Sequence, residues 1–403
     1  MSFMLVGNQK SVVHMDLDSF FVSVEVLHNP RLKNRAVLIG GGSDRGVVAS
    51  CSYEARRFGV HAGMPMKLAR RLCPQAIIQR GDAERYSYYS NVVTQIVEEE
   101  VPLYEKSSID EFYIDLTGMD KFFGNYKLAS EIRQRITRET GLPISFGLSQ
   151  NKTVSKVATG EAKPNGQMQI EFGNEKVFLS PLSIKKIPGV GSKTYYLLRD
   201  MGVQKIQTLQ QMPVELMNSV LGKHGIVLWK KANGIDNTPV VPYTEAKSIS
   251  TEQTFEKDTI DVARLRVILM AMTEKLAFKL RKQEKLTACV AVKIRYSDFD
   301  THTVQKRIPY SSADHVLAKV AQELFEKLYQ RRLLVRLIGV RFSHLVSGGY
   351  QINLFDDTEE MINLYQAMDR MKIRFGSDKI HRAATLGIKH HDFNPFNGKK
   401  TGD

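Results

Sequence analysis

Short apolar strands and amphipathic helices alternate along the first half of the chain. Val12 to Leu17 is an apolar run that ends in carboxylates, and Leu103 to Thr117 predicts a hairpin with its turn near Ser107 to Asp110. Pro143 to Ser149 is expected to form another strand. Between these strands, apolar residues at helical spacing predict two helices, the second of which stops at Gly141. These residues are Tyr89, Val93, Ile96 and Val97 in the first helix, and Leu128, Ile132 and Ile136 in the second.

This order of elements predicts a split βαβ domain with helices on one face of an antiparallel sheet. The other face of the sheet would then be free for a ligand. Residues 31–80 interrupt the unit with three consecutive glycines, Gly40 to Gly42, and a basic helix from Glu54 to Phe58. We interpret this stretch as an inserted subdomain with a small core.

A glycine turn lies between two predicted helices in the middle of the chain. Ile187 to Gly191 precedes Lys193 and a helix that runs to Gly202, which is typical of a helix-hairpin-helix whose backbone amides can hold a phosphate. The turn lacks the third glycine of a dinucleotide-binding fingerprint. A plain glycine turn between helices is the alternative. Asp236 to Ala246, which contains two prolines, is expected to be a linker.

The pattern after this linker predicts the order strand, helix, two strands, helix, strand. The helices are expected at Val262 to Lys285 and His315 to Arg331, each with an apolar stripe. In the strand Thr287 to Tyr296, every second residue is apolar, and Lys293 and Arg295 alternate onto the opposite face. One face of this sheet is therefore expected to be core and the other basic.

The charge balance of the chain indicates what that basic face binds. The chain has 57 Lys and Arg against 43 Asp and Glu, a net charge of +14, and more than half of the surplus lies between Asp261 and Val346. Solvated surface charge would explain one or two of these bases, but a whole basic domain favours a polyanion with regularly spaced phosphates. Nucleic acid is the expected partner.

Composition excludes several other classes. With 403 residues, 42% of them hydrophobic, the chain is expected to fold as two to four globular domains. No apolar run approaches the length of about 20 residues that a bilayer requires, and Met1 to Lys10 does not resemble a signal peptide, so we expect neither export nor a membrane partner. Cys51, Cys73 and Cys289 are widely spaced and odd in number, which favours the reducing cytoplasm over a disulfide framework.

Carboxylates follow both strand systems of the first domain. Asp16 and Asp18 close the first strand, and Asp110 and Glu111 lie together in the hairpin, so folding can gather three or four acids at one sheet edge. Oxygen ligands without a nearby Cys or His cluster favour Mg²⁺, or Mn²⁺, and two such ions can serve a phosphoryl displacement. Because a strand alternates its faces, we expect Asp18 and Asp115 to be caps or surface charges. Asp110 and Glu111 face the same objection unless a twist or bulge relieves it.

Four motifs, in order and spacing, resemble Y-family DNA polymerases of the DinB type, which are related to UmuC. They are Met15 to Phe21, Ser52 to Val60, Ser108 to Phe112 and Ala162 to Gly166. The resemblance implies an α+β multidomain, right-hand polymerase with a ferredoxin-like palm, small fingers, a helical thumb with a helix-hairpin-helix and a βαββαβ little finger. The expected bounds are 11–30 and 81–170 for the palm, 31–80 for the fingers, 171–240 for the thumb, 247–346 for the little finger and 347–403 for a C-terminal extension.

The same resemblance implies translesion DNA synthesis, in which a primer on template DNA is extended with deoxynucleoside triphosphates by a monomer. Asp16 and Asp110 would bridge two Mg²⁺ ions, Glu111 would serve the ion that activates the primer hydroxyl, and the Leu17 carbonyl would complete the nucleotide ion. The triphosphate would be held by Tyr53, Arg56, Lys163 and the backbone amides around Phe20 and Phe21. Phe21 would exclude a ribose 2′-hydroxyl, and Val47 and Ala49 would roof the replicating pair. Expected DNA contacts are Lys185, Lys186, Gly189, Gly191, Lys193, Lys293, Arg295, Arg336 and Arg341.

A short segment after the last basic strand resembles the peptide that binds the bacterial sliding clamp. It runs from Gln351 to Phe355, with Gln351, Ile352, Leu354 and Phe355 as the expected contacts. A strand or helix lead-in packed on its own domain is the alternative. Beyond it, Met361, Leu364, Tyr365, Met368 and Met371 recur at helical spacing and predict a docked helix.

Two other functions stay in view. A non-catalytic DNA- and clamp-binding relative would keep the fold, but such a protein should lack the acids, because clustered carboxylates without a cation repel one another. A nucleotide cyclase on a palm-like sheet would keep the acids, but it would leave the helix-hairpin-helix and the basic C-terminal sheet unexplained.

Overall fold

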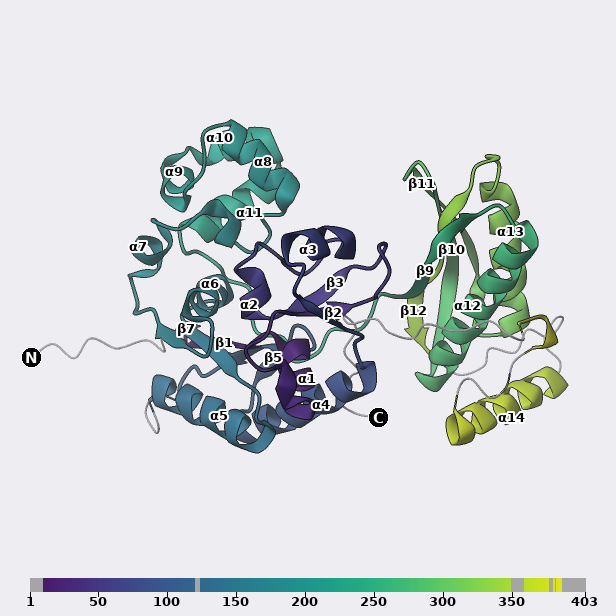
Figure 1. Cartoon of the computed structure of the whole chain (residues 1–403), viewed down its shortest axis with the longest axis horizontal. Helices are drawn as coiled ribbons and strands as arrows, with labels where there is room; N and C mark the ends of the chain where they lie inside the picture. The colour runs from purple at the N-terminus through teal and green to yellow at the C-terminus, as the bar shows by residue number, and fades with distance from the viewer. Residues whose placement is uncertain (1–9, 120–123, 349–358, 377–379, 381, 386–403) are drawn as a thin grey trace, which may run out of the picture. The chain divides into compact units, whose positions relative to one another are not determined.

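The computed structural model describes residues 10–119, 124–348, 359–376, 380 and 382–385. They form two compact units, divided between Thr244 and Glu245 (Figure 1). The segment Gln351 to Phe355, which the sequence predicts to bind a clamp, lies outside the described residues.

The first unit is built on a mixed sheet with the strand order β5-β6-β1-β7-β8. Its strands are β1 (Val12–Leu17), β5 (Tyr104–Lys106), β6 (Glu111–Asp115), β7 (Ile144–Ser149) and β8 (Gln167–Gln169). The predicted strands at Val12 to Leu17 and Pro143 to Ser149 and the predicted hairpin are therefore confirmed. Apolar side chains of alternate strand residues, such as Val13, Met15 and Phe146, form a buried core with the helices below the sheet.

Those helices are α1 (Phe20–His28), α4 (Ala83–Glu100) and α5 (Asn125–Thr140), and α5 ends at Gly141 in a left-handed conformation with φ 72°, as predicted. The opposite face is not entirely free, contrary to the sequence-based expectation. Helix α6 (Lys152–Ala162) packs on β7 and β1, where Gly147 leaves room: a Cβ there would lie 2.4 Å from the Ser155 carbonyl oxygen. Figure 1 shows α6 beside β7 and β1.

A separate small sheet and a helical cluster complete the first unit. The sheet has the order β3-β2-β4, from β3 (Val48–Cys51), β2 (Val37–Gly40) and β4 (Ile77–Gln79), and encloses a small core with α2 (Tyr53–Arg56) and α3 (Met66–Leu72). The helical cluster has its own apolar core. It contains α7 (Glu175–Leu179), the 3₁₀ turn η2 (Ile184–Lys186), α8 (Ser192–Asp200), α9 (Ile206–Gln211), α10 (Val214–Leu221) and α11 (Lys223–Ala232).

The second unit contains the predicted order strand, helix, two strands, helix, strand. Its sheet has the order β11-β10-β12-β9, and α12 and α13 contribute to its core. The elements are β9 (Ser248–Thr259), α12 (Val262–Lys282), β10 (Lys285–Tyr296), β11 (Thr301–Ser311), α13 (Asp314–Leu328) and β12 (Val335–Ser347). In β10, Val290, Val292 and Ile294 are fully buried, whereas Lys293 and Arg295 are half-buried on the other face, as the alternation predicts.

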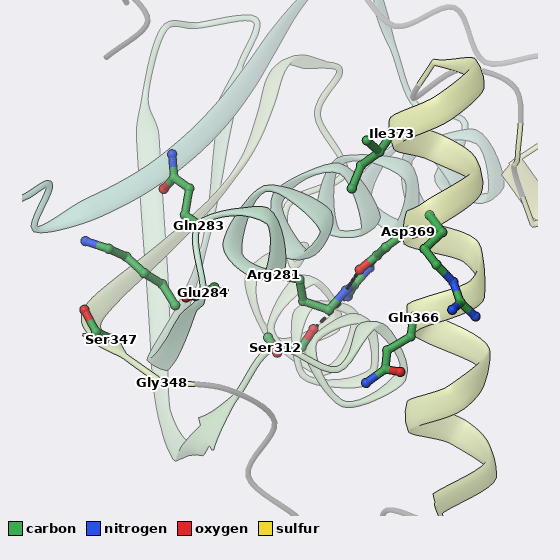
Figure 2. Close-up of a pocket in the computed structure, with 11 residues that line it drawn as sticks. Arg281, Gln283, Glu284, Ser312, Ser347, Gly348, Gln366, Asp369 and Ile373 are labelled. Atoms are coloured by element: carbon green, nitrogen blue, oxygen red, sulfur yellow. Dashed lines mark hydrogen bonds and ion pairs between the residues drawn. The ribbon is translucent and has the colours of Figure 1, made fainter. Parts of the chain in front are cut away.

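The predicted C-terminal helix is α14 (Glu359–Phe375), and it docks on α12 and α13 through a buried arginine. Arg281 donates to both carboxylate oxygens of Asp369, at 2.6 and 2.9 Å (Figure 2). Arg281 also donates to Asp314 at 2.6 Å. The Tyr365 hydroxyl lies 2.7 Å from Nδ1 of His315, and Tyr365 is fully buried. A pocket of about 690 Å³ remains beside this contact, lined in part by Gln366. The ion pair therefore joins the extension to the second unit.

We expect Asp369→Asn to lower the free energy of unfolding of the second unit by about 1.5–3 kcal/mol, because a buried guanidinium loses the charge of one hydrogen-bond partner. Urea unfolding of the full chain measures the change in the free energy of unfolding, and the rate of proteolytic cleavage in α14 shows whether the helix is still docked. Glu360→Gln is the matched control, since it removes a charge from an exposed position of the same helix. Equal stability of the two variants would show that the contact does not hold α14.

Candidate active site

The three predicted metal ligands meet at one end of β1 and β6. Asp16 pairs with Glu111 in the antiparallel register, and the Leu17 amide donates to the Asp110 carbonyl at 3.1 Å. Burial, together with the negative charges of Asp110 and Glu111, raises the pKa of Asp16 to about 7 even though the charge of Lys163 lowers it. The carboxylates are thus close enough to perturb one another, which is the arrangement expected of a cation site.

The sequence alone leaves open how neighbouring acids can converge, and the turn before β6 provides the answer. Asp110 precedes the strand, and the amides of Ser107 and Ser108 both donate to the Glu111 carbonyl, at 3.0 and 3.4 Å. Strand alternation therefore does not apply to Asp110. Its Oδ1 accepts a hydrogen bond from Ser108 Oγ at 2.6 Å, and burial raises its pKa.

Lysines from α6 and its C-terminal cap pair with two of the acids. Lys163 binds Asp16 and lies 3.6 Å from Asp18, and Lys156 binds Glu111 at 2.6 Å. Burial opposes ionisation of Glu111, but the neighbouring His14 ring and the charge of Lys156 outweigh it and hold the pKa of Glu111 well below the usual range. Sequence reasoning named Lys163 as a phosphate ligand but missed Lys156.

These ion pairs bear on the expected metal site. In the part of the chain that the structure describes, no three His, Cys, Asp or Glu side chains stand ready around a common ion position. The donor set nevertheless fits a hard divalent cation, because Asp16, Asp110 and Glu111 offer only oxygens, and the charges of Asp110 and Glu111 oppose the ionisation of Asp16. The lysines supply part of the neutralising charge that the cluster needs.

Asp18 corrects one expectation. It is not a surface charge: it is 2% exposed, and it accepts hydrogen bonds from the Tyr53 hydroxyl at 3.1 Å, Ser145 Oγ at 2.9 Å and the Asn165 amide at 2.6 Å. It lies two residues after Asp16, just past the end of β1, and this spacing is the signal that could have identified it. Asp18 ties α2 to the sheet and to the segment after Lys163. Asp115, by contrast, caps a turn, as expected: its Oδ1 accepts from the Thr117 amide at 2.9 Å.

The remaining residues expected at the nucleotide lie around this cluster. The Arg56 guanidinium lies over the Tyr53 ring, 4.7 Å from its centre. Phe21, on α1, is 5% exposed and stacks on Tyr86, with ring centres 4.3 Å apart. The Tyr86 hydroxyl donates to buried Glu25 at 2.7 Å. The Phe21 ring is thus held in one position by its neighbours.

The other residues predicted to line the nucleotide site or to hold a metal differ in their exposure. Phe20 is buried beside Phe21, with ring centres 5.4 Å apart. Val47 is exposed, and Ala49 packs against the core of the main sheet. Leu17, whose carbonyl is an expected ligand, has a buried side chain that anchors the end of β1 in that core.

The expected DNA contacts of the first unit cluster at the glycine turn before α8. Gly189 has φ 104°, a conformation that disfavours other residues, and Gly191 is the residue before the helix. Lys185 lies over the Tyr195 ring, and Lys186 pairs with Glu161 at 2.7 Å. The turn, with Lys193 in the first turn of α8, has the form of a phosphate-binding hairpin.

The expected contacts of the second unit are spread over its sheet. Lys293 pairs with Glu252, and Arg295 donates to Thr301 Oγ1 at 2.8 Å. Arg336 lies over the exposed Phe299 ring, 4.5 Å from its centre, and Arg341 is exposed on β12. None of the helices in the described residues is long and apolar enough to cross a membrane.

An acid-bearing sheet, a glycine hairpin between helices and a basic sheet are features that a template-directed nucleic-acid polymerase combines. Residues 15–160 match the impB/mucB/samB family, residues 246–354 match the C-terminal domain of that family, and residues 185–236 match the thumb domain of DNA polymerase-iota.

Curated relatives and solved structures agree with this class. The chain is 38% identical to DNA polymerase IV of Dehalococcoides mccartyi strain BAV1, over 94% of this chain and 98% of the relative, and 35% identical to DNA polymerase IV of Desulfatibacillum aliphaticivorans, over 93% and 96%. The Y-family DNA polymerase chimera Dbh-Dpo4(243-245)-Dbh superposes with a TM-score of 0.74 at 28% identity, covering 84% of this chain and all of the other. An insertion ternary complex of Dbh DNA polymerase matches over the same shares, with a TM-score of 0.62 at 27% identity.

The chain belongs to the Y family of DNA polymerases, in its DinB or DNA polymerase IV branch. It is a DNA-directed DNA polymerase of the translesion class, and it depends on divalent metal as the family does.

Proposed function

We propose that this polymerase extends the 3′ end of a primer at the cluster of Asp16, Asp110 and Glu111. The observation that carries the proposal is the convergence of the three carboxylates at the paired ends of β1 and β6. Asp16, Asp110 and Glu111, with the Leu17 carbonyl, would hold two Mg²⁺ ions, and Glu111 would serve the one that activates the primer hydroxyl. When bound, the two ions neutralise charge on the attacking and leaving oxygens.

The residues around the cluster would bind the incoming deoxynucleoside triphosphate. Arg56 offers a planar fork to phosphate oxygens. Lys163 offers a compact positive charge, which forms an ion pair with Asp16 in this structure. Tyr53 is fixed by Asp18 beside them, and the amides around Phe20 and Phe21 would complete the phosphate contacts. Lys163 would therefore exchange a carboxylate oxygen for a phosphate oxygen when the nucleotide binds.

Two further features would select the substrate. The fixed ring of Phe21 would collide with a ribose 2′-hydroxyl. Val47 and Ala49 are small, so they would roof the replicating pair without closing tightly on a damaged template base.

We assign the domains as expected from the sequence: residues 11–30 and 81–170 to the palm, 31–80 to the fingers, 171–240 to the thumb and 247–346 to the little finger. The thumb hairpin and the basic sheet of the little finger would bind the phosphates of primer-template DNA. Support comes from the hairpin geometry around Gly189 and from the alternation of Lys293 and Arg295 away from the core. The polymerase would act as a monomer.

Primer extension tests this assignment. The unmodified chain should add the templated nucleotide in Mg²⁺ and should stop when the metal is chelated. A non-catalytic DNA-binding relative would bind the primer-template but extend nothing. A cyclase would consume a nucleoside triphosphate without a template. Either outcome would overturn the proposal.

We further propose that Gln351 to Phe355 binds the bacterial sliding clamp. The chain is held just before this segment, where the Gly348 amide donates to the Glu284 carbonyl at 2.9 Å, and again at α14 by Arg281. The described residues on either side of this segment are therefore anchored to the second unit, and its sequence, a glutamine followed by apolar anchors, is suited to docking on a partner.

We expect the double variant Leu354→Ala with Phe355→Ala to lose stimulation by the clamp and to keep distributive synthesis, because only the apolar anchors of the peptide are removed. Primer extension with and without a loaded clamp measures this. Leu364→Ala with Phe375→Ala is the matched control, since both residues are exposed on α14. Loss of distributive synthesis as well would point to a folding role.

A further inference from the structure

The segment from Lys163 to Gly166, which we call the Lys163 turn, connects α6 to β8. Lys163 is the C-terminal cap of α6, and Asn165 has φ 50°, a left-handed conformation that asparagine adopts more readily than most residues. The Asn165 amide donates to Asp18 at 2.6 Å, and the Gly166 amide donates to Ser145 Oγ at 3.1 Å. These bonds hold the amides of the turn to the sheet, and they leave the carbonyl and side-chain oxygens of Asn165 to other donors.

One arginine of α5 binds both of those oxygens. Arg133 Nη2 donates to the Asn165 carbonyl at 2.8 Å and to Asn165 Oδ1 at 2.6 Å. Arg133 Nε donates to the carbonyl of Ile144, the first residue of β7, at 2.9 Å. Ile144 pairs with Leu17, at the end of β1 where the acids lie. Because the guanidinium is a rigid, planar fork, Arg133 fixes the Lys163 turn relative to that strand end.

Arg133 differs in its partners from Arg135, the other half-buried arginine of α5. Arg135 forms ion pairs with acids of α4 and of its own helix, namely Glu99 at 2.5 Å, Glu100 at 2.6 Å and Glu139 at 2.9 Å. The three hydrogen bonds of Arg133 go instead to uncharged oxygens of the Lys163 turn and of β7. Charge pairing therefore explains Arg135, whereas the bonds of Arg133 hold a segment of backbone in place.

We propose that Arg133 is a positioning residue for Lys163: by fixing the Lys163 turn, it sets where the lysine ammonium lies before a nucleotide binds. This inference rests on the proposed role of Lys163 in binding the triphosphate. The ammonium pairs with Asp16 and lies 3.6 Å from Asp18, so on a fixed turn only the side chain has to exchange partners. A turn that is already ordered also spares the entropy that ordering it during binding would cost. Arg133 binds the turn and β7 rather than the acid cluster, so it acts on the nucleotide only through Lys163.

Steady-state primer extension tests the proposal through the KM for the incoming deoxynucleotide. We expect Arg133→Met to raise this KM about threefold to tenfold and to leave kcat nearly unchanged, because a phosphate contact made equally in the bound substrate and in the transition state affects KM alone. Arg133→Lys keeps the charge but cannot span the turn and β7 at once, so its KM should rise as well. A normal KM in Arg133→Lys would show that charge is sufficient and would overturn the proposal.

Lys163→Met, alone and combined with Arg133→Met, shows whether the arginine acts through the lysine. Lys163→Met should itself raise the KM, and adding Arg133→Met should raise it no further, because the position of the turn no longer matters once the ammonium is gone. If Arg133→Met raises the KM by the same factor in both backgrounds, Arg133 acts by another route and the proposal is overturned.

Two further measurements protect the test against misfolding of Arg133→Met. Asn165→Gly removes the side-chain oxygen that Arg133 binds but keeps a residue that accepts φ 50°, and it should raise the KM about twofold to threefold. In the unliganded chain, hydrogen exchange of the Asn165 and Gly166 amides should be faster in Arg133→Met than in the unmodified protein. Unchanged exchange, together with a normal KM in Asn165→Gly, would overturn the proposal.

Arg135→Met is the matched control, because it makes the same substitution on the same helix and removes contacts to α4 and α5 only. It should lower the temperature of thermal unfolding and leave the KM for the deoxynucleotide normal. If Arg135→Met raised the KM as much as Arg133→Met, the effect would come from loosening α5, and the role of Arg133 would be overturned.

The outcomes separate this inference from the proposed function. If Lys163→Met raises the KM while Arg133→Met and Asn165→Gly leave it unchanged, the role of Arg133 is overturned and the proposed nucleotide site stands. If Lys163→Met itself leaves the KM unchanged, the proposed role of Lys163 fails, and the inference fails with it.

Discussion

Asp110→Asn should reduce the rate of templated nucleotide incorporation by about 1,000-fold or more, which corresponds to about 4 kcal/mol of transition-state stabilisation. Asparagine keeps the shape of the side chain and can still accept the hydrogen bond from Ser108, so the turn before β6 should persist. What is lost is one negative charge from a buried cluster that must bind two divalent cations. Single-turnover primer extension at saturating Mg²⁺ and nucleotide measures the rate.

The matched control is Asp115→Asn at the other end of β6. Asp115 accepts a hydrogen bond from the Thr117 amide at 2.9 Å and lies outside the acid cluster, so this variant should extend the primer at the normal rate. The two variants have the same change in charge, one just before β6 and the other at its last residue. Normal synthesis by Asp110→Asn would remove the proposed metal site, and equal losses in both variants would indicate damage to β6 rather than to a ligand.

The sheet and its acids could be predicted because local patterns specify them. Alternation in Val12 to Leu17 and helical spacing from Tyr89 to Val97 describe elements whose apolar faces are continuous in the sequence, and the structure confirms both. The C-terminal helix was predicted in the same way, from apolar residues between Met361 and Met371. The strand and the helix α4 contribute apolar faces to a core, which is the signal that a single sequence carries, whereas α14 buries only Tyr365 of its apolar stripe and leaves Leu364 and Met371 exposed.

Helix α6 was missed because its buried face is largely polar. Lys152, Thr153, Ser155 and Thr159 are all buried, and they find partners in the sheet and in the adjoining thumb rather than in an apolar layer. The close approach depends on Gly147, whose effect is visible only once β7 and α6 are in contact. Hydrophobic periodicity does not detect a helix of this kind.

The partners of the charged residues could not be predicted from the sequence either. Lys163 and Asp16 are 147 residues apart, and Lys156 and Glu111 are 45 apart, so their pairing follows from strand register and not from spacing. Asp18 was read as a surface charge because local alternation cannot show three donors arriving from β7, α2 and the segment after Lys163. Arg281 likewise could not be distinguished in the sequence from the other basic residues, because its partner Asp369 lies on α14, 88 residues further along the chain.

Phe21→Ala should reduce discrimination against ribonucleotides by about 100-fold or more. A ring that cannot move aside imposes a clash worth about 3 kcal/mol on a ribose 2′-hydroxyl, and alanine removes it. The Phe21 ring cannot move easily, because it stacks on Tyr86 at 4.3 Å and the Tyr86 hydroxyl is held by Glu25 at 2.7 Å. The ratio of kcat/KM for a deoxynucleotide to that for the matching ribonucleotide measures the change.

Loss of a buried ring also costs stability, about 3–5 kcal/mol for Phe to Ala, so the variant needs a control that is destabilised but intact at the nucleotide. Leu128→Ala fits, because Leu128 lies in the same core on α5 and should lose a comparable amount. That variant should keep its preference for deoxynucleotides. If Phe21→Ala kept the preference as well, the sugar would be selected elsewhere. If both variants lost it, discrimination would depend on the rigidity of the whole palm core rather than on one ring. The braced stack of Phe21, Tyr86 and Glu25 favours the single ring, since it fixes the position of the side chain without help from α5.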